Sequence, residues 1–188
     1  MALLEIVTQE TDEESLRTVA SEIKNVKDAE LQTLINDMID TLHEAEGVGL
    51  AAPQVGRKIK LAIIETLPDY DEDDEPIEGT RDLYVIINPK IVWSSRKTMD
   101  GIEGCLSIPG YLGEVERPFA IRVQALDRHG RKKRYRLKGW DARIFQHEID
   151  HLNGILYTDI LTSADRYWTE EEYEAYRKEQ EEADKEPV

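Results

Sequence analysis

The sequence has a single cysteine, Cys105, and this scarcity limits what the chain can be. One cysteine cannot form an intramolecular disulfide, which is typical of proteins kept in a reducing cytosol. No apolar run approaches the ~20 residues that a membrane-spanning helix needs. The first residues, Met1–Val7, also lack the basic stretch and long apolar segment of a secretory signal. These absences predict a cytoplasmic protein without membrane contact.

Positive charge is also scarce, because 24 Lys and Arg residues face 40 Asp and Glu residues and the formal net charge is −16. Phosphates repel such a chain, so direct nucleic-acid binding is not expected. The acidic residues gather in two segments. Residues 69–82 carry eight acidic side chains and one arginine, and residues 162–188 carry ten acidic and four basic side chains. We expect both to be solvated surface, the first as a mobile loop.

A chain of 188 residues with 40% hydrophobic residues is long enough for one domain with a core. Asp28 can cap a helix whose apolar residues, from Leu31 to Leu42, recur at helical spacing until Gly47. Four β-type runs follow. They cover residues 60–64, 83–87 (stopped by Asn88-Pro89), 120–126 and 133–137, the last two joined by the turn 127–130.

Thr169 and Glu172 form a capping-box pattern that predicts a last helix, which has little apolar surface. The succession of a helix, several short strands and further helices predicts an α+β fold. We assign residues 1–165 to one domain. Residues 166–188 are expected to form an acidic C-terminal helix or tail that is partly disordered.

The segment Gln146–His151, Gln-His-Glu-Ile-Asp-His, carries the strongest functional pattern. His147 and His151 lie one turn apart on the same face of a helix and can bind one metal ion, with Glu148 beside a metal-bound water. A separate apolar stripe, Phe145, Ile149 and Leu152, supports a core-facing helix. Asn153-Gly154 supplies its stop signal. With a third ligand and an open position, the pattern would indicate metal-assisted hydrolysis. A surface helix with two unrelated histidines is the alternative.

Two other segments have unusual compositions. Glu103–Gly110 contains Cys105, which could be a third metal ligand, and the N–H of Leu106 could face the same site. A buried core cysteine is the alternative for Cys105. Gly47–Gln54 is rich in glycine and alanine, which let another chain approach the backbone, and it ends with an amide donor at Gln54. An ordinary small-residue turn would have the same composition.

With these three segments, the chain strongly resembles the peptide deformylases. The family's motifs correspond to Gly47–Gln54, Glu103–Ser107 and His147–His151, in the family's order, and the resemblance runs from about Ile23 to Leu161. It implies one catalytic domain in which strands pack around a central helix that carries the third motif. It also implies a metal-dependent hydrolase that removes the N-terminal formyl group from newly synthesised polypeptides beginning with formylmethionine.

The resemblance also implies roles for individual residues. The metal ligands would be Cys105, His147 and His151. The residues contacting substrate would be Val48, Gly49, Gly104 and Ile144. Glu148 would be the general base, and Gln54 with the N–H of Leu106 would stabilise the oxyanion. Glu103 and Arg117 would form a supporting ion pair behind the ligands.

The implied cofactor is one divalent ion per chain. In the resembled family it is usually ferrous iron, and zinc, nickel or cobalt can occupy the same ligands, so ligand identity does not choose among them. The implied partners are nascent formyl-methionyl peptides. Some bacterial members end in a basic helix that docks on ribosomal RNA, whereas residues 162–188 are acidic here. Ribosome contact through this tail is therefore not expected.

Two positions depart from the family pattern. Many members have an arginine where this chain has Leu112, which removes one polar contact to substrate beyond its first residue. Glu14–Arg17 also stands in place of a Pro-x-Leu-Arg sequence. Three other interpretations compete with a deformylase. The chain could be a zinc peptidase, although Asp159 is the only nearby acid after the motif; a thiol hydrolase with Cys105 as nucleophile; or an inactive metal-stabilised binding module.

Overall fold

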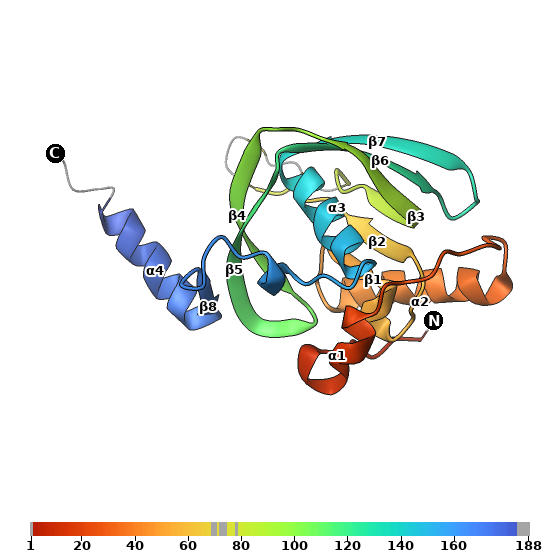
Figure 1. The fold of residues 1–188 in the computed structure, drawn as a ribbon, viewed down its shortest axis with the longest axis horizontal. Helices are drawn as coiled ribbons and strands as arrows, with labels where there is room; N and C mark the ends of the chain where they lie inside the picture. Colours follow the sequence, from red (N-terminus) through yellow and green to blue (C-terminus); the bar gives the residue numbers. More distant parts are fainter. Residues whose placement is uncertain (1, 69–70, 72–74, 78, 184–188) are drawn as a thin grey trace.

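The structure, a computed structural model, describes residues 2–68, 71, 75–77 and 79–183. Within these residues the strands form two antiparallel sheets, accompanied by α-helices that pack on them or join them (Figure 1). This arrangement confirms the predicted α+β fold. The loop predicted at 69–82 lies partly outside the described residues.

Eight strands of the described chain make up the two sheets. The five-stranded sheet has the order β1-β2-β3-β6-β7, with β1 at Gly49–Ala51, β2 at Leu61–Glu65, β3 at Leu83–Ser94, β6 at Ala120–Leu126 and β7 at Lys132–Lys138. The three-stranded sheet has the order β4-β5-β8, with β4 at Thr98–Cys105, β5 at Ile108–Pro118 and β8 at Tyr167–Thr169. The predicted strand at 60–64 and the predicted hairpin of 120–126 with 133–137 are confirmed.

The helical segments were predicted in part. They are α1 at Gln9–Arg17, α2 at Ala29–Glu44, α3 at Gly139–His151 and α4 at Glu170–Ala183, with 3₁₀ turns at Ala52–Val55 and Tyr157–Asp159. Asp28 caps α2 by accepting hydrogen bonds from the N–H groups of Glu30 and Leu31. Its buried face includes Leu31 and Leu42, as the helical spacing predicted. The α1 segment had no clear periodic signal.

The predicted stop of the second strand at Asn88-Pro89 is wrong. Strand β3 continues through these residues to Ser94, and its pairing with β6 shifts register between Ile87 and Lys90. Asn88 adopts a positive φ of 50°, and its side chain exchanges hydrogen bonds with the backbone of Ile23 at 2.8 and 2.9 Å. The strand therefore accommodates Pro89 at a bulge, because proline has no N–H to donate to the regular hydrogen bonds between strands.

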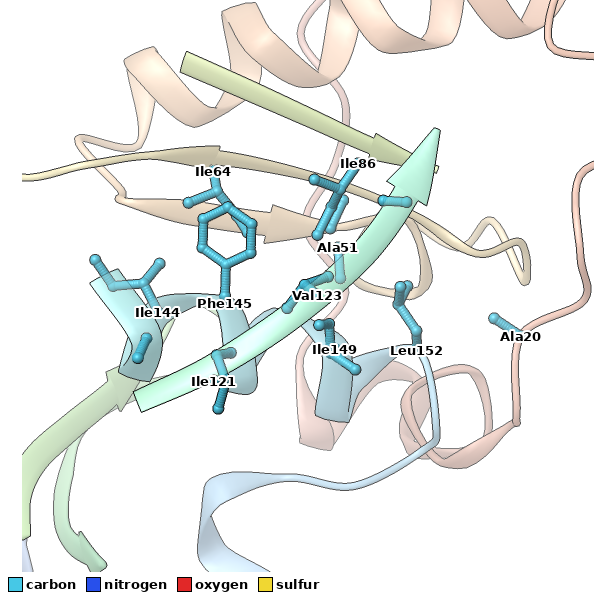
Figure 2. Packing of buried hydrophobic residues seen from close by; sticks show 13 residues of the cluster. Ala20, Ala51, Ile64, Ile86, Ile121, Val123, Ile144, Phe145, Ile149 and Leu152 are labelled. Atoms are coloured by element: carbon cyan, nitrogen blue, oxygen red, sulfur yellow. The ribbon is translucent and has the colours of Figure 1, made fainter. Parts of the chain in front are cut away.

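Helix α3 runs through the space between the two sheets (Figure 1). Its apolar face packs on the five-stranded sheet, where Phe145 lies among Ile64, Ile121 and Val123 (Figure 2). The predicted stripe is confirmed, because Phe145, Ile149 and Leu152 are all buried. The helix places its opposite face, which carries the histidines, toward β4 and β5.

The predicted stop after α3 is also confirmed, and at Gly154 the chain lies close against the backbone of Arg17. Gly154 has a φ of +73°, which side chains other than glycine rarely adopt. A Cβ at this position would overlap the carbonyl oxygen of Arg17 and lie 2.8 Å from its carbonyl carbon. Glycine therefore lets the chain leave α3 against the end of α1.

The C-terminal segment has two parts. Strand β8 lies beyond the predicted boundary at residue 165, yet it pairs with β5 from Tyr111 to Gly113. Helix α4 then begins with the predicted capping box, in which the N–H of Thr169 donates to Glu172 at 2.8 Å and the N–H of Glu172 donates back to the Thr169 hydroxyl at 3.2 Å. It projects away from the body of the protein and buries none of its described residues (Figure 1). Among the described residues, no helix has the length and apolar character needed to cross a bilayer.

Candidate metal centre

The three candidate ligands meet at the junction of β4 and α3. The Cys105 sulfur lies 3.3 Å from His151 Nε2, which lies 3.2 Å from His147 Nε2. All three donor atoms lie within 4.8 Å of one another. The helical spacing of the two histidines brings their rings together, with centroids 4.9 Å apart. A metal ion could therefore contact one sulfur and two nitrogens.

These separations suit a first-row divalent ion. A tetrahedral ion with typical zinc bond lengths would hold two nitrogens about 3.3 Å apart, and a sulfur and a nitrogen about 3.6 Å apart. The observed separations of 3.2 and 3.3 Å come close to both values. Three protein ligands also leave a fourth position for water or substrate, which is typical of catalytic rather than structural sites. The donor set thus fits the implied cofactor.

Glu103 orients one of the imidazoles from behind. Its Oε2 lies 2.8 Å from His147 Nδ1, so the ring donates from Nδ1 and directs Nε2 toward Cys105 and His151. Arg117 donates to both oxygens of Glu103, at 2.6 and 2.9 Å, and to Asp150 at 2.7 Å. The ion pair expected between Glu103 and Arg117 is therefore present, and both side chains are buried.

A second buried arginine, Arg143, joins this network. It donates to Glu103 Oε1 at 2.7 Å and to the carbonyl oxygens of Val115 and Met99 at 2.9 and 2.5 Å. The side chain is 2% exposed. No sequence motif includes Arg143. Its position four residues before His147 was the only available signal, because this spacing puts both on one face of α3.

The charges of the site favour a cation among the donor atoms. Burial raises the pKa of Cys105, but His151 and His147 lower it more, so the pKa lies well below that of an ordinary thiol. Burial likewise raises the pKa of Glu103, but Arg117 and His147 lower it further, so this group is a carboxylate. A thiolate on one side and a carboxylate on the other stabilise positive charge between them.

Glu148 lies beside the ligands in a dry environment. It is 3% exposed, and within the described chain its Oε2 is buried without a hydrogen-bond partner. Burial raises the pKa of Glu148 to about 7. A bound divalent ion would lower this value, because a nearby positive charge favours the carboxylate. Such a group can accept and return a proton near neutral pH.

Gly49 provides the space that Glu148 occupies. A Cβ on Gly49 would overlap Oε1 of Glu148 and lie 2.5 Å from its Cδ and 2.8 Å from its Cγ. The backbone of β1 therefore lies directly against the carboxylate. The small residues of this segment predicted that another chain could approach its backbone closely. In the structure, the side chain of Glu148, from the same chain, lies against the backbone at Gly49.

Gln54 directs an amide donor at the same place. Its Oε1 accepts from the N–H of Ala51 at 2.8 Å, so Nε2 must point the other way. Nε2 lies 3.2 Å from the Ser107 hydroxyl and 3.5 Å from the Cys105 sulfur. The backbone N–H of Ser107 donates to this sulfur at 3.4 Å. This contact was not predicted, because the sequence pattern pointed to the N–H of the preceding residue, Leu106.

The N-terminal segment connects the first two motifs. The N–H of Val7 donates to the carbonyl oxygen of Gln54 at 2.8 Å, and the N–H of Gln9 donates to that of Ser107 at 2.9 Å. Val7 and Cys105 both pack against the buried cluster that includes Leu16 and Ile108. These two bonds fix the spacing between the amide donor and the cysteine loop.

A pocket of about 550 Å³ opens in front of the donor atoms. All four residues assigned to substrate contact line it: Val48, Gly49, Gly104 and Ile144. Leu106 and Leu112 add apolar walls, and the pocket also reaches Cys105, His147 and Glu148. An apolar chamber next to a polar cluster is typical of a binding site for an extended molecule with a reactive end.

Comparison with known proteins identifies the family. A family model described as polypeptide deformylase matches residues 3–167. The chain belongs to the peptide deformylase family. A relative named peptide deformylase 2, from Nostoc sp., is 44% identical over 161 residues, which are 85% of this chain and 88% of the relative.

Solved structures of other peptide deformylases share the fold. A peptide deformylase from Ehrlichia chaffeensis in complex with actinonin is 40% identical, with a TM-score of 0.76 over 88% of this chain and 92% of that one. A class I type b peptide deformylase from Acinetobacter baumannii, bound to Met-Ala-Ser, is 32% identical, with a TM-score of 0.75 over 85% of this chain and 99% of that one.

Proposed function

We propose that this protein is a metal-dependent deformylase that removes the N-terminal formyl group from peptides beginning with formylmethionine. One observation carries the proposal: a Cys-His-His donor triangle with Glu148 beside it, at the base of an apolar pocket, in a chain of this family. Metal-assisted hydrolysis needs these elements: three ligands, an open position and an adjacent base.

In the proposed mechanism, Cys105, His147 and His151 would hold the ion. When bound, the ion acts as a Lewis acid and lowers the pKa of water from 15.7 toward ~7. A thiolate ligand donates charge and weakens this effect, so the base becomes more important. Glu148 accepts the proton of the attacking water and passes it to the peptide nitrogen as the C–N bond breaks. The products are formate and a free amino terminus.

The developing negative charge requires its own donors. We assign Nε2 of Gln54 to the oxygen of the formyl group, because the bond from Ala51 to its Oε1 turns this donor toward the site. The N–H of Leu106 is assigned to the same oxygen by the family resemblance. Losing one donor of this kind typically costs about 3–4 kcal/mol of transition-state stabilisation.

The substrate is proposed to bind as an extended strand beside β1. This strand is at the edge of the five-stranded sheet, so its outer backbone can pair with another chain. Val48 and Gly49 would offer backbone groups, Gly104 would allow close approach, and Ile144 would contact the methionine side chain. A related deformylase whose structure contains bound Met-Ala-Ser supports a short peptide substrate that begins with methionine.

We propose ferrous iron as the native metal and expect zinc, nickel or cobalt to fit the same ligands. Metal content measured on anaerobically purified protein tests this assignment. We also propose that helix α4 does not dock on ribosomal RNA, because residues 170–183 carry an excess of acidic side chains. Sedimentation with ribosomes at low salt, abolished by deleting residues 170–188, would contradict this second proposal.

The function is tested by comparing formyl-Met-Ala-Ser with unformylated Met-Ala-Ser. We expect formate release from the first peptide and no cleavage of the second. A chelator should abolish activity, and Fe²⁺ or Co²⁺ should restore it. Cleavage of the Met-Ala bond would favour a zinc peptidase. Activity that survives complete metal removal would favour a thiol hydrolase, since Cys105 and His151 are also close enough for that chemistry.

A further inference from the structure

We propose that Arg143 is a positioning residue for the metal centre, holding Glu103 in the orientation that directs His147 toward the ion. This inference rests on the proposed function only in requiring that Cys105, His147 and His151 bind a metal. Arg143 is outside the motifs that define the site by sequence. Its effect is transmitted through Glu103, so Arg143 does not touch the reacting atoms.

The hydrogen bonds of Glu103 are shared among two arginines and His147. Oε1 accepts from Arg117 Nε at 2.6 Å and from Arg143 at 2.7 Å, and Oε2 accepts from Arg117 at 2.9 Å and lies 2.8 Å from His147 Nδ1. Each oxygen therefore has two partners. Without Arg143, Oε1 would lose one of them, and the carboxylate could turn about its bonds to Arg117 and away from His147.

Arg143 is itself held rigidly. Besides Glu103, it bonds to the carbonyl oxygens of Met99 in β4 and Val115 in β5, and its position on α3 is one turn before His147. One guanidinium thus joins both strands to the helix that carries two of the proposed ligands. A planar group with several fixed donors suits this task, whereas a lysine would supply a single ammonium.

Gly101 provides the space for the guanidinium. A Cβ on Gly101 would lie 2.8 Å from Cζ of Arg143, 2.9 Å from its Nε and 2.9 Å from its second terminal nitrogen. A methyl group here would displace the arginine without removing its charge. Gly101 and Arg143 therefore offer two independent ways to disturb the same contact.

Of the two histidines, His147 is the one that Glu103 orients. The Nδ1 of His147 is tied to Glu103, whereas in the described chain Nδ1 of His151 is buried without a hydrogen-bond partner. Glu103 is thus the partner through which an imidazole of this centre is oriented. Loss of such outer contacts typically weakens metal binding by about 10–100-fold.

The experiment measures Co²⁺ affinity by competition with a chelator, without substrate, in Arg143→Met, Arg143→Lys and Gly101→Ala. We expect Arg143→Met to raise the Kd for Co²⁺ by about 10–100-fold. Arg143→Lys should recover part of this loss, and Gly101→Ala should change the Kd in the same direction as Arg143→Met. The absorption band from the Cys105 thiolate to Co²⁺ should shift in each weakened variant.

Gln146→Met is the matched control. Gln146 is buried on the same helix and donates to the carbonyl oxygen of Pro118 at 3.1 Å, so its loss removes a helix-to-sheet bond that does not involve Glu103. This variant should lose thermal stability and keep the Kd for Co²⁺ within about twofold of the original. A folded Arg143→Met with an unchanged Kd would overturn the proposal. If Arg143→Met does not fold, an unchanged Kd in Gly101→Ala overturns it instead.

The two proposals fail in different ways. Wild-type protein that binds Co²⁺ tightly but releases no formate from formyl-Met-Ala-Ser would contradict the proposed function and leave the role of Arg143 standing. Wild-type protein that deformylates, combined with an Arg143→Met variant of equal Co²⁺ affinity, would contradict only the role of Arg143. Wild-type protein without Co²⁺ affinity would overturn the positioning role directly.

Discussion

Replacing Gly49 with alanine should disable the proposed base without removing it. The added Cβ would lie 2.5 Å from Cδ of Glu148, whereas non-bonded carbon atoms prefer ~3.5–4.0 Å. Strand β1 cannot easily yield, because Leu50 and Ala51 are completely buried and Gly49 pairs with Ile64 in β2. The carboxylate must therefore move by about 1 Å.

A displacement of this size has a large kinetic effect. Misplacing a catalytic group by about 1 Å can cost on the order of 10²-fold in rate, which corresponds to ~2.7 kcal/mol of activation free energy. We expect kcat for formyl-Met-Ala-Ser to fall by about this factor, measured as formate release with saturating substrate. Metal content should remain equal to that of the wild type, because none of the three ligands lies among the atoms nearest the added Cβ.

A double-variant comparison isolates the cause. In the Glu148→Gln background the base is already absent, so adding Gly49→Ala should lower kcat by less than about threefold. A Gly49→Ala enzyme with full metal content and kcat within twofold of wild type would refute the reasoning. Equal losses in both backgrounds would also refute it, since they would show that Gly49 acts independently of Glu148.

Three further predictions concern single positions. Glu148→Gln should retain the metal, measured by elemental analysis, and lose about 10²–10⁴-fold in kcat; a smaller loss would exclude a role as general base. Gln54→Ala should lower kcat by about 10²–10³-fold with little change in metal content, if its amide stabilises the oxyanion. Gly154→Ala should lower the free energy of unfolding by more than the ~1–2 kcal/mol that a positive φ alone costs, because its Cβ also overlaps the Arg17 carbonyl. Gly56→Ala, with a φ of +71° and open space around it, is the control for thermal unfolding, and equal losses would exclude the overlap as a cause.

Local patterns predicted the elements whose signals are contained in one stretch of sequence. The α2 helix follows from its cap at Asp28 and its periodic apolar face, and the end of α3 follows from Gly154. Strand β3 was cut short because Asn88-Pro89 ordinarily ends a strand. The backbone N–H of Ile23, which is 65 residues away, donates to the Asn88 side chain and so stabilises the bulge. No local pattern contains that contact.

In the candidate metal centre too, local sequence predicted some residues, whereas others depend on contacts between distant parts of the chain. The spacing of His147 and His151 indicated two ligands, and the family resemblance supplied Cys105. The contacts of Arg143 could not be inferred in this way, because Glu103 is 40 residues from it in sequence. The donation from Val7 to Gln54 joins residues that are also far apart in sequence. Chemistry concentrated in a motif can be predicted, whereas the residues that hold the motif depend on the tertiary fold.

The pairing of β8 with β5 has a consequence for shortened forms of the chain. Cutting after residue 165 would remove Tyr167–Thr169 and leave the main chain of Tyr111–Gly113 without its neighbour. Tyr111 and Leu112 also line the pocket. The unpaired edge of β5 would therefore compete with the edge of β1 for extended polypeptides. Trimmed proteins would then self-associate or capture peptides out of reach of the donor atoms, and both effects should disappear when Tyr167–Thr169 are retained.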